Sequence, residues 1–216
     1  VFDGDLVRVT NVRSFRYTAR RDFAPRYVNR TYDLRKLQGV SYVLTPFKLS
    51  FRGPAHSFVT FEFADSQFVS ISVEARREPG ESYDIWKGML RNFEVLYVVG
   101  DEQDVIGQRA AFDSSHVYLY PIRATKDKMR AMFVAMLERA NQLREHPEFY
   151  NTVTNNCTSN VIDHVNAIVP GTVPTGWRTV LPGYSDELGI RLGLIDTKLD
   201  IEKARAQYLI HARART

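Results

Sequence analysis

Two neighbouring segments in the first half of the chain alternate between apolar and polar residues, and this alternation constrains the fold more than any other feature. The segments are residues 56–63 (HSFVTFEF) and 68–76 (FVSISVEAR), and the residues between them, 64–67 (ADSQ), are typical of a turn. A period of two residues is that of a β-strand with one buried face. The sequence therefore predicts an antiparallel β-hairpin.

The alternation also predicts which side of the hairpin faces the core. Successive side chains of a strand point to opposite faces, and the apolar residues that share one face are Val59, Phe61, Phe63, Val69, Ile71, Val73 and Ala75. The opposite face is polar and includes His56, Glu74 and Arg76. Aligning the two apolar faces pairs odd residues with odd residues, which places His56 opposite Glu74 or Arg76. A carboxylate is therefore expected beside the imidazole.

The remaining chain alternates between further strands and helices. Strands are expected at residues 6–12, 94–99 and 117–121, and short helices near Leu34 and at 86–92. A long amphipathic helix is predicted at 126–144, and a second helix begins near Cys157 and ends before Pro170. From about residue 171 an irregular tail is expected, with polar helical residues from Ile201 onward. These elements predict one α+β domain over residues 1–216, a central antiparallel sheet flanked by helices.

Composition and charge leave several classes of partner open. The 29 basic and 25 acidic residues give a formal net charge of +4 and are interspersed along the chain. This weak basic excess is compatible with an anionic membrane surface, and the basic clusters lack the aromatic interleaving of a nucleic-acid groove. The chain begins at Val1 without a signal-peptide pattern or a run of 18 apolar residues, so we expect it to be a fragment.

Cys157 is the only cysteine, which excludes an intramolecular disulfide and a zinc site built on paired cysteines. It lies in TNNCTSN (154–160) at the start of a predicted helix, with Thr154, Asn155 or Asn156 available as the N-cap. A helix N-terminus favours the reactive thiolate, and its N–H groups can donate to an oxyanion. A lone cysteine is often a small buried apolar residue, but the polar flanks favour a nucleophile, with Asn156 and Thr158 as oxyanion or substrate contacts.

A thiol nucleophile needs a base, and position separates the five histidines. They are His56, His116, His146, His164 and His211. His164 lies on the predicted helix of Cys157 but about 10 Å along its axis, His146 precedes a proline at a helix end, and His211 lies in the polar tail. His116 remains a candidate without an evident acidic partner. His56 has such a partner in Glu74 and is the predicted base.

A histidine on a strand facing a cysteine at a helix start is the arrangement of papain-like enzymes, with Glu74 fixing the imidazole. Other interpretations stay open at this point. His56 is also compatible with a surface position at the start of the hairpin, and Glu74 and Arg76 with an exposed cross-strand ion pair. Alternatively, the planar guanidinium of Arg76 suits a substrate carboxylate or phosphate.

Six segments give the chain a resemblance to a known family. They are NVRSFRY (11–17), YDL (32–34), AHSFVTFEF (55–63), SVEARRE (72–78), GDEQDVIGQR (100–109) and YNTVTNNCTSN (150–160). The chain is similar to the Lnb N-terminal periplasmic domain family of lipoprotein N-acyltransferases. That family resembles permuted papain-like (NlpC/P60-like) thiol enzymes, in which the histidine strand precedes the cysteine helix, as His56 precedes Cys157 here.

The resemblance implies a thiol-dependent acyltransferase of the bacterial envelope. Cys157 and His56 match the expected dyad, and Glu74, Arg76 and Asn156 match motif positions. A phospholipid acyl donor, a lipoprotein or other amine acceptor and a membrane surface would be the partners, without nucleic acid, metal or cofactor. The location would be periplasmic, with inner-membrane anchoring through a segment absent from this chain.

Two other functions remain alternatives at this stage. One is a cysteine peptidase or amidase of the cell envelope, and the other is a catalytically inert envelope-binding module. A buried, unreactive Cys157 with His56 more than about 6 Å away would favour the inert module, because a working dyad needs hydrogen-bond reach. Within GDEQDVIGQR, a structural salt-bridge network is expected rather than a second site, formed by Asp101, Glu102, Asp104 and Arg109.

Overall fold

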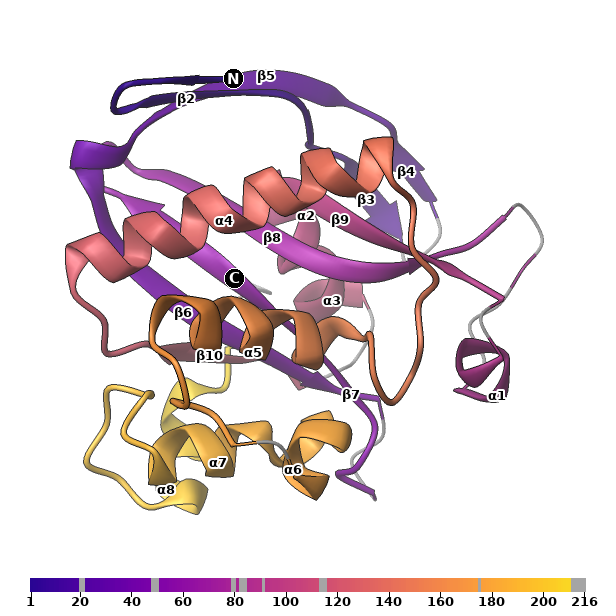
Figure 1. The fold of residues 1–216 in the computed structure, drawn as a ribbon, viewed down its shortest axis with the longest axis vertical. Coiled ribbons are helices and arrows are strands. Elements are labelled where there is room, and N and C mark those ends of the chain that lie inside the picture. The colour runs from indigo at the N-terminus through magenta and orange to yellow at the C-terminus, as the bar shows by residue number, and fades with distance from the viewer. Residues whose placement is uncertain are drawn as a thin grey trace.

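A computed structural model of the protein describes residues 1–19, 22–47, 51–78, 81, 85–90, 92–112, 116–174 and 176–210. Its centre is an eight-stranded sheet in the order β1-β2-β9-β8-β7-β6-β10, with β5 also paired to β2 (Figure 1). The strands are β1 (Phe2–Asp3), β2 (Leu6–Arg13), β5 (Tyr27–Asp33), β6 (Leu37–Pro46), β7 (Ala55–Phe63), β8 (Gln67–Arg76), β9 (Glu94–Asp101) and β10 (Tyr118–Pro121). β3 (Arg16–Ala19) and β4 (Asp22–Ala24) form a separate small sheet.

The predicted hairpin is β7 and β8, and its register is the predicted one. Val59 lies opposite Ile71, so that odd residues face odd residues. The predicted core face is buried, apart from Ala75, which is half-buried. The sheet as a whole is antiparallel except for one parallel contact, between Arg13 of β2 and Gly100 of β9.

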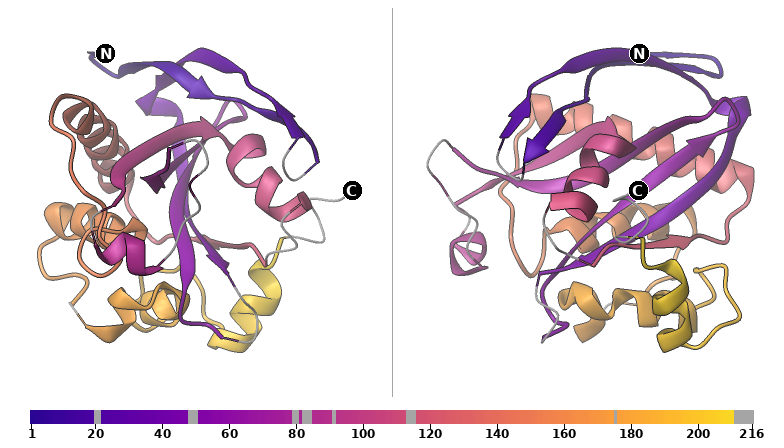
Figure 2. Two further views of the ribbon diagram at one scale, coloured as in Figure 1. Left: turned by 90° about the vertical axis from the view of Figure 1, so that its right-hand side faces the viewer. Right: turned by 180° about the vertical axis from the view of Figure 1, so that it is seen from behind.

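Helices cover both faces of this sheet. α4 (Lys126–Glu145) and α5 (Cys157–Ile168) lie on one face, and α2 (Glu102–Val105) and α3 (Gly107–Phe112) lie on the other (Figure 2). The two longer helices agree with the sequence expectation. The short helix expected at 86–92 is α1 (Ile85–Met89), and residue 91 lies outside the described residues. The short helix expected near Leu34 is a single 3-10 turn, Leu34–Lys36.

The two faces of the sheet pack into two separate hydrophobic clusters. The larger lies under α4 and α5 and includes the buried methionines Met129, Met132 and Met136. The smaller lies under α2 and α3 and joins Phe58 of β7 to Val105 and Ile106. The polar face of the hairpin is therefore largely buried, and it places its hydroxyl and imidazole groups inside the protein, where they need partners.

The segment after residue 171 is more regular than the sequence indicates. It contains α6 (Trp177–Val180), a 3-10 turn (Pro182–Tyr184), α7 (Ser185–Arg191) and α8 (Ile201–Tyr208). The carboxylate of Asp186 is fully buried. It accepts a hydrogen bond from the Tyr120 hydroxyl at 2.9 Å and from Arg205 Nε at 2.7 Å. This network fastens α7 and α8 to β10, at the lower edge of the molecule in Figure 1.

The GDEQDVIGQR segment performs two separate tasks. Asp104 is fully buried and accepts hydrogen bonds from Arg13 Nη2 at 2.9 Å and from the Phe15 backbone N–H at 2.8 Å, which ties β2 to α2. Asp101 stands at the N-cap position of α2. Arg109 does not join Asp104 but extends to β8. The described helices include none long and apolar enough to cross a membrane.

Candidate active site

Cys157 is the first residue of α5, and the cap of this helix explains its position. Asn156 is the N-cap: its Oδ1 accepts hydrogen bonds from the backbone N–H groups of Thr158 and Ser159, at 2.8 and 2.9 Å. Ser159 Oγ accepts from the Asn156 N–H at 2.8 Å, completing a capping box. The cap thus fixes the backbone conformation of the first turn of α5, which contains Cys157.

His56, at the second residue of β7, lies against Cys157. The imidazole and the thiol are hydrogen-bonded to each other, although they are 101 residues apart in the chain. Both side chains are largely buried, with residue exposures of 7% and 4%. They line one cleft of about 560 Å³, so the pair is nevertheless in contact with a space that a ligand can enter.

Glu74 of β8 approaches His56 from the side of Nε2. Its Oε1 lies 3.1 Å from Nε2, and the Ser72 Oγ lies 2.7 Å from the same nitrogen. The Ser72 hydroxyl donates to Glu74 Oε1 at 2.8 Å, so it is free to accept from Nε2–H. The sequence predicted Glu74 opposite His56, whereas Ser72 was not identified from the sequence as a site residue.

Arg109 of α3 completes the surroundings of Glu74. Its Nη2 donates to Glu74 Oε1 at 2.9 Å, and its Nη1 donates to the Val105 carbonyl at 2.7 Å. The guanidinium also lies over the Phe58 ring, 5.3 Å from its centroid. Arg109 thus holds the carboxylate that contacts the imidazole. The salt-bridge network expected among Asp101, Glu102, Asp104 and Arg109 is wrong, because Arg109 pairs with Glu74 and Asp104 pairs with Arg13.

The charges of these groups reinforce one another. Burial alone would lower the pKa of His56, but the carboxylate of Glu74 and the neighbouring Cys157 raise it to about 9. Burial likewise opposes ionisation of Glu74, yet His56 and Arg109 hold its pKa far below the usual range. For Cys157, the charge and hydrogen bond of His56 outweigh burial, and its pKa is lowered. The site therefore favours a thiolate–imidazolium pair over two neutral groups.

Comparison with known proteins places this geometry in a family. Residues 23–183 match the family model described as the Lnb N-terminal periplasmic domain, a range that includes His56, Glu74 and Cys157. The chain belongs to the Lnb N-terminal periplasmic domain family. Neither the curated proteins nor the solved structures contain a significant match. The family assignment confirms the coarser part of the sequence-based resemblance and makes the chain a periplasmic domain.

The predicted oxyanion contacts of this Lnb-family domain are engaged within the protein. Asn156 Nδ2 donates to the Thr152 carbonyl at 2.8 Å, and Thr158 Oγ1 is hydrogen-bonded to Ser57 Oγ at 2.8 Å. Asn156 still lines the cleft. At the first position of α5, the N–H of Cys157 itself has no carbonyl acceptor within the helix. The Ser57 backbone also forms a hydrogen bond to the Cys157 thiol, which helps to lower the pKa of this thiol.

Arg76 lies apart from the other predicted site residues of the Lnb-family domain. Its Nη1 donates to Glu94 Oε2 at 2.8 Å, and 66% of its side chain is exposed. It does not line the cleft. The arginines that do are Arg77 and Arg109. Alternation puts Arg76 on the same face as Glu74, but Arg76 is the last residue of β8 and is exposed, so its long side chain reaches solvent.

The remaining histidines of the Lnb-family domain are used elsewhere or lie outside the described residues. His164 Nε2 is hydrogen-bonded to the Tyr97 hydroxyl at 3.0 Å, and burial lowers its pKa to about 4. His146 caps the C-terminus of α4, and the His116 ring lies near Tyr118. His211 is outside the described residues. Among the described histidines, His56 is thus the one at Cys157.

Replacing Glu74 with glutamine is expected to lower the pKa of His56. The carboxylate stabilises the imidazolium and raises the pKa to about 9, whereas a neutral amide does not. The pKa should fall by about 1 to 3, the usual effect of a close opposite charge. An NMR titration of the His56 ring measures it, with Glu94→Gln as the control because Glu94 pairs with the remote Arg76. An unchanged His56 titration in Glu74→Gln would contradict this electrostatic account.

Proposed function

We propose that this domain is a thiol-dependent acyltransferase, in which Cys157 is the nucleophile, His56 the base and Glu74 the residue that orients His56. The observation that carries the proposal is the contact of the Cys157 thiol with His56, whose Nε2 is 3.1 Å from Glu74 Oε1. A nucleophile, its base and an orienting carboxylate in this order are what covalent acyl transfer needs. The hydrogen bond also argues against an inert binding module, although Cys157 is buried.

In the proposed first half-reaction, the Cys157 thiolate attacks the carbonyl carbon of an ester. A C–S bond forms, the ester C–O bond breaks, and the leaving alkoxide takes the proton of the His56 imidazolium. Nε2 is occupied by Glu74 and Ser72, so we assign the transferred proton to Nδ1. The product is a thioester of Cys157, and the N–H of Cys157 donates to the oxyanion of the tetrahedral intermediate.

In the second half-reaction, an amine attacks the thioester carbon. A C–N bond forms and the C–S bond breaks, and the proton lost by the amine passes to His56. This step restores the thiolate–imidazolium pair, so the enzyme needs no added acid, metal or cofactor in this scheme. Water in place of the amine would make the domain a hydrolase. The proposed acceptor is the amine of a lipoprotein.

The order of the two catalytic elements supports a relation to permuted papain-like enzymes. His56 lies on a strand that precedes the helix of Cys157 in the sequence. In the permuted NlpC/P60-like branch, the histidine strand also comes first. We propose this fold relationship as part of the function, because it accounts for a thiol enzyme with the chain order found here.

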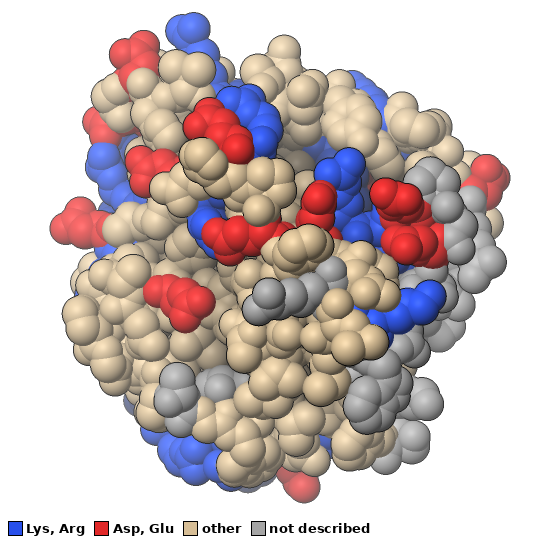
Figure 3. All heavy atoms as spheres, turned by 45° about the vertical axis from the view of Figure 1, so that its right-hand side comes forward, with Lys and Arg blue, Asp and Glu red and all other residues tan. Residues whose placement is uncertain are grey.

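A membrane surface is the proposed source of the acyl donor, and the rim of the cleft supports this. Four large apolar side chains that line it are at least 39% exposed: Phe47, Met89, Val153 and Val180. The exposed side chains of Phe51, Leu90 and Trp177 lie close to these residues in the chain. Figure 3 shows charged side chains mainly in the upper half of one face, above a largely uncharged lower half. Exposed apolar groups beside a cleft mark a binding surface, and insertion into lipid would bury them.

Two arginines near α6 and α7 pair with acidic residues, Arg178 with Glu187 at 3.3 Å and Arg52 with Asp186 at 3.7 Å, and both also stack on aromatic rings. Arg178 lies over the Trp177 ring, 4.2 Å from its centroid, and Arg52 lies over the Tyr184 ring at 4.8 Å. Aromatic rings and basic groups side by side suit the interface between lipid headgroups and acyl chains. Anchoring to the inner membrane through a segment outside this chain is also part of the proposal, and it would hold the cleft near its substrate.

The test of the proposed function is to trap an acylated Cys157 with phospholipid. The protein is incubated with vesicles of phosphatidylethanolamine and phosphatidylglycerol, and intact-mass spectrometry follows the added acyl mass. We expect a hydroxylamine-sensitive adduct on the wild type, none on Cys157→Ser, and its transfer to the amine of a diacylated lipopeptide. Turnover of cell-wall peptides without any lipid-derived adduct would instead establish the peptidase or amidase alternative.

The same assay tests the role of the rim. The double variant Leu90→Ser/Trp177→Ser is expected to acylate Cys157 at least tenfold more slowly from vesicles and at an unchanged rate from detergent-dispersed lipid. Phe68→Ser is the control, because Phe68 is 38% exposed at the opposite end of β8 from Glu74. Equal slowing with vesicles and with detergent would mean that the rim does not act by binding a membrane.

A further inference from the structure

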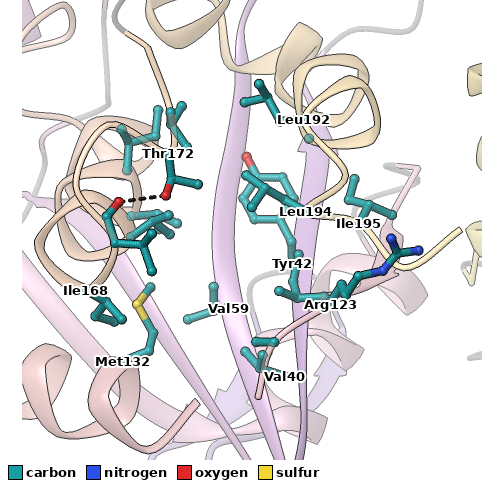
Figure 4. Close-up of a pocket in the computed structure, with 18 of the residues that line it drawn as sticks. Val40, Tyr42, Val59, Arg123, Met132, Ile168, Thr172, Leu192, Leu194 and Ile195 are labelled. Atoms are coloured by element: carbon teal, nitrogen blue, oxygen red, sulfur yellow. Dashed lines mark hydrogen bonds between the residues drawn. The ribbon is translucent and has the colours of Figure 1, made fainter. Parts of the chain in front are cut away.

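A second cavity, of about 200 Å³, lies alongside α5 and is distinct from the cleft of Cys157. Side chains of α5 form one wall, and β6, β7, α7 and the residues around 192–195 form the other (Figure 4). Among those that point inward are Val59, Met132, Val161, Val165, Leu188 and Ile195. The cavity is therefore enclosed mainly by aliphatic groups and offers few hydrogen-bonding partners to a ligand.

The charged side chains that border this cavity lie at its edge. They are Arg123 and Lys128. The Arg123 guanidinium extends away from the other labelled side chains in Figure 4 and pairs with Asp196 at 2.9 Å. Across the cavity from Arg123, the Thr172 hydroxyl donates to the Val169 carbonyl. A ligand that fits the interior must consequently be apolar along most of its length.

The inner end of the cavity adjoins the nucleophile. Thr158 lines this cavity, while its neighbour Cys157 lines the catalytic cleft. The Cys157 Sγ lies 3.9 Å from Thr158 Oγ1. Two hydrogen-bonded pairs of hydroxyl groups lie between the two spaces. The Thr158 hydroxyl is bonded to that of Ser57 at 2.8 Å, and the Tyr42 hydroxyl is bonded to that of Ser185 at 2.7 Å. One layer of side chains thus separates the sulfur from the apolar interior.

The shape of the cavity suits an extended chain. Its lining residues on α5 run from Thr158 to Ile168, a span of roughly 15 Å at the rise of an α-helix. At roughly 30 Å³ for a group the size of water or a methylene, the enclosed volume holds about seven such groups. A longer chain would continue through the open end near Leu192.

We propose that this cavity binds the aliphatic chain of the acyl group that Cys157 carries, a role that rests on the proposed function. The chain passes the Ser57–Thr158 hydroxyl layer and lies along α5, with its methyl end toward Ile168 and Leu192. The catalytic cleft, lined by the charged or polar side chains of Glu74, Arg77 and Arg109, is left for the headgroup and the amine. The carbonyl group of the acyl chain would then react in the catalytic cleft, while its aliphatic part is bound in the cavity along α5.

The test compares a short and a long ester of one leaving group. Cys157 is acylated by p-nitrophenyl acetate or p-nitrophenyl dodecanoate, and release of p-nitrophenolate is followed. Val165→Trp fills the cavity, whereas Ala167→Trp adds the same ring to an exposed position of the same helix. We expect Val165→Trp to lower kcat/KM for the dodecanoate at least tenfold and to leave that for the acetate within twofold. Ala167→Trp should change neither.

The outcomes distinguish the cavity from the catalytic site. Failure of the wild type to react with the acetate would overturn the proposed function itself. A reactive wild type in which Val165→Trp leaves the dodecanoate rate unchanged would overturn the cavity proposal alone. If Val165→Trp does not fold, Ile168→Trp at the other end of the cavity replaces it, with the same selective loss expected. Equal losses with both esters would also contradict the proposal.

Discussion

Replacing His56 with alanine is expected to lower the rate of Cys157 acylation by about 10²- to 10⁴-fold, the usual contribution of a general base. The same change should raise the pKa of Cys157. In the wild type, the charge and hydrogen bond of His56 outweigh the effect of burial. Without them, burial remains, so the pKa of the thiol should reach or exceed the free value of about 8.5.

The measurement is the rate of Cys157 alkylation by iodoacetamide as a function of pH. The wild type should be labelled through a thiolate with an apparent pKa below 8.5, and His56→Ala should be labelled slowly at neutral pH. His164→Ala is the matched control, because His164 is on the same helix as Cys157 but contacts Tyr97. If Cys157 is alkylated with the same pH profile in the wild type and in His56→Ala, then His56 does not act as the base for Cys157.

Replacing Asp186 with alanine is expected to lower the free energy of unfolding by about 3 to 5 kcal/mol, as for other broken buried ion pairs. The carboxylate is fully buried, and its loss leaves Arg205 and the Tyr120 hydroxyl without their acceptor. The buried positive charge then has to be desolvated without compensation. Urea unfolding followed by circular dichroism measures this change.

Asp196→Ala is the control for this second prediction. Asp196 also pairs with an arginine, Arg123, but 60% and 57% of the two side chains are exposed. An exposed pair contributes at most about 1 kcal/mol. If both variants lose the same free energy, burial does not determine the contribution of Asp186, and the fastening of α7 and α8 to β10 must rest on other contacts.

The hairpin and its register could be predicted from the sequence, because apolar and polar residues alternate along a strand that has one buried face. One apolar face must enter the core, and a shift of one residue would turn that face outward. This argument placed Glu74 or Arg76 opposite His56, and in the structure it is Glu74 that contacts the imidazole. Likewise, a helix start with polar residues before Cys157 was visible in TNNCTSN, because capping residues are local signals.

Contacts between distant segments were not accessible to the same reasoning. Nothing in residues 100–109 indicates that α2 and α3 lie across the sheet from α4. The hydrogen bond from Arg109 to Glu74 could therefore not be predicted from the sequence. The helical structure of α6 and α7 was missed for a similar reason, whereas the helix from Ile201 onward was expected. The position of α7 depends on the carboxylate of Asp186, which accepts hydrogen bonds from Tyr120 of β10 and Arg205 of α8. A local sequence pattern does not indicate partners that lie on other elements.

The direction of a side-chain amide is a third property that the sequence leaves open. Asn156 was expected to offer its amide to an oxyanion, because it stands next to the nucleophile. Its oxygen instead caps α5, and its nitrogen is bonded to the Thr152 carbonyl. Both polar ends of the side chain are needed to hold the turn before Cys157, so the residue supports the nucleophile through backbone geometry.

Part of the cavity wall that would contact an acyl chain lies outside the segment that contains the catalytic groups. His56, Glu74 and Cys157 lie within the family match, which ends at residue 183, whereas Leu188, Leu192 and Ile195 of the cavity lie beyond it. Substitutions of these three residues would therefore alter chain-length preference without changing the catalytic groups. Related domains with one catalytic apparatus would then be free to diverge toward the lipids of different bacteria.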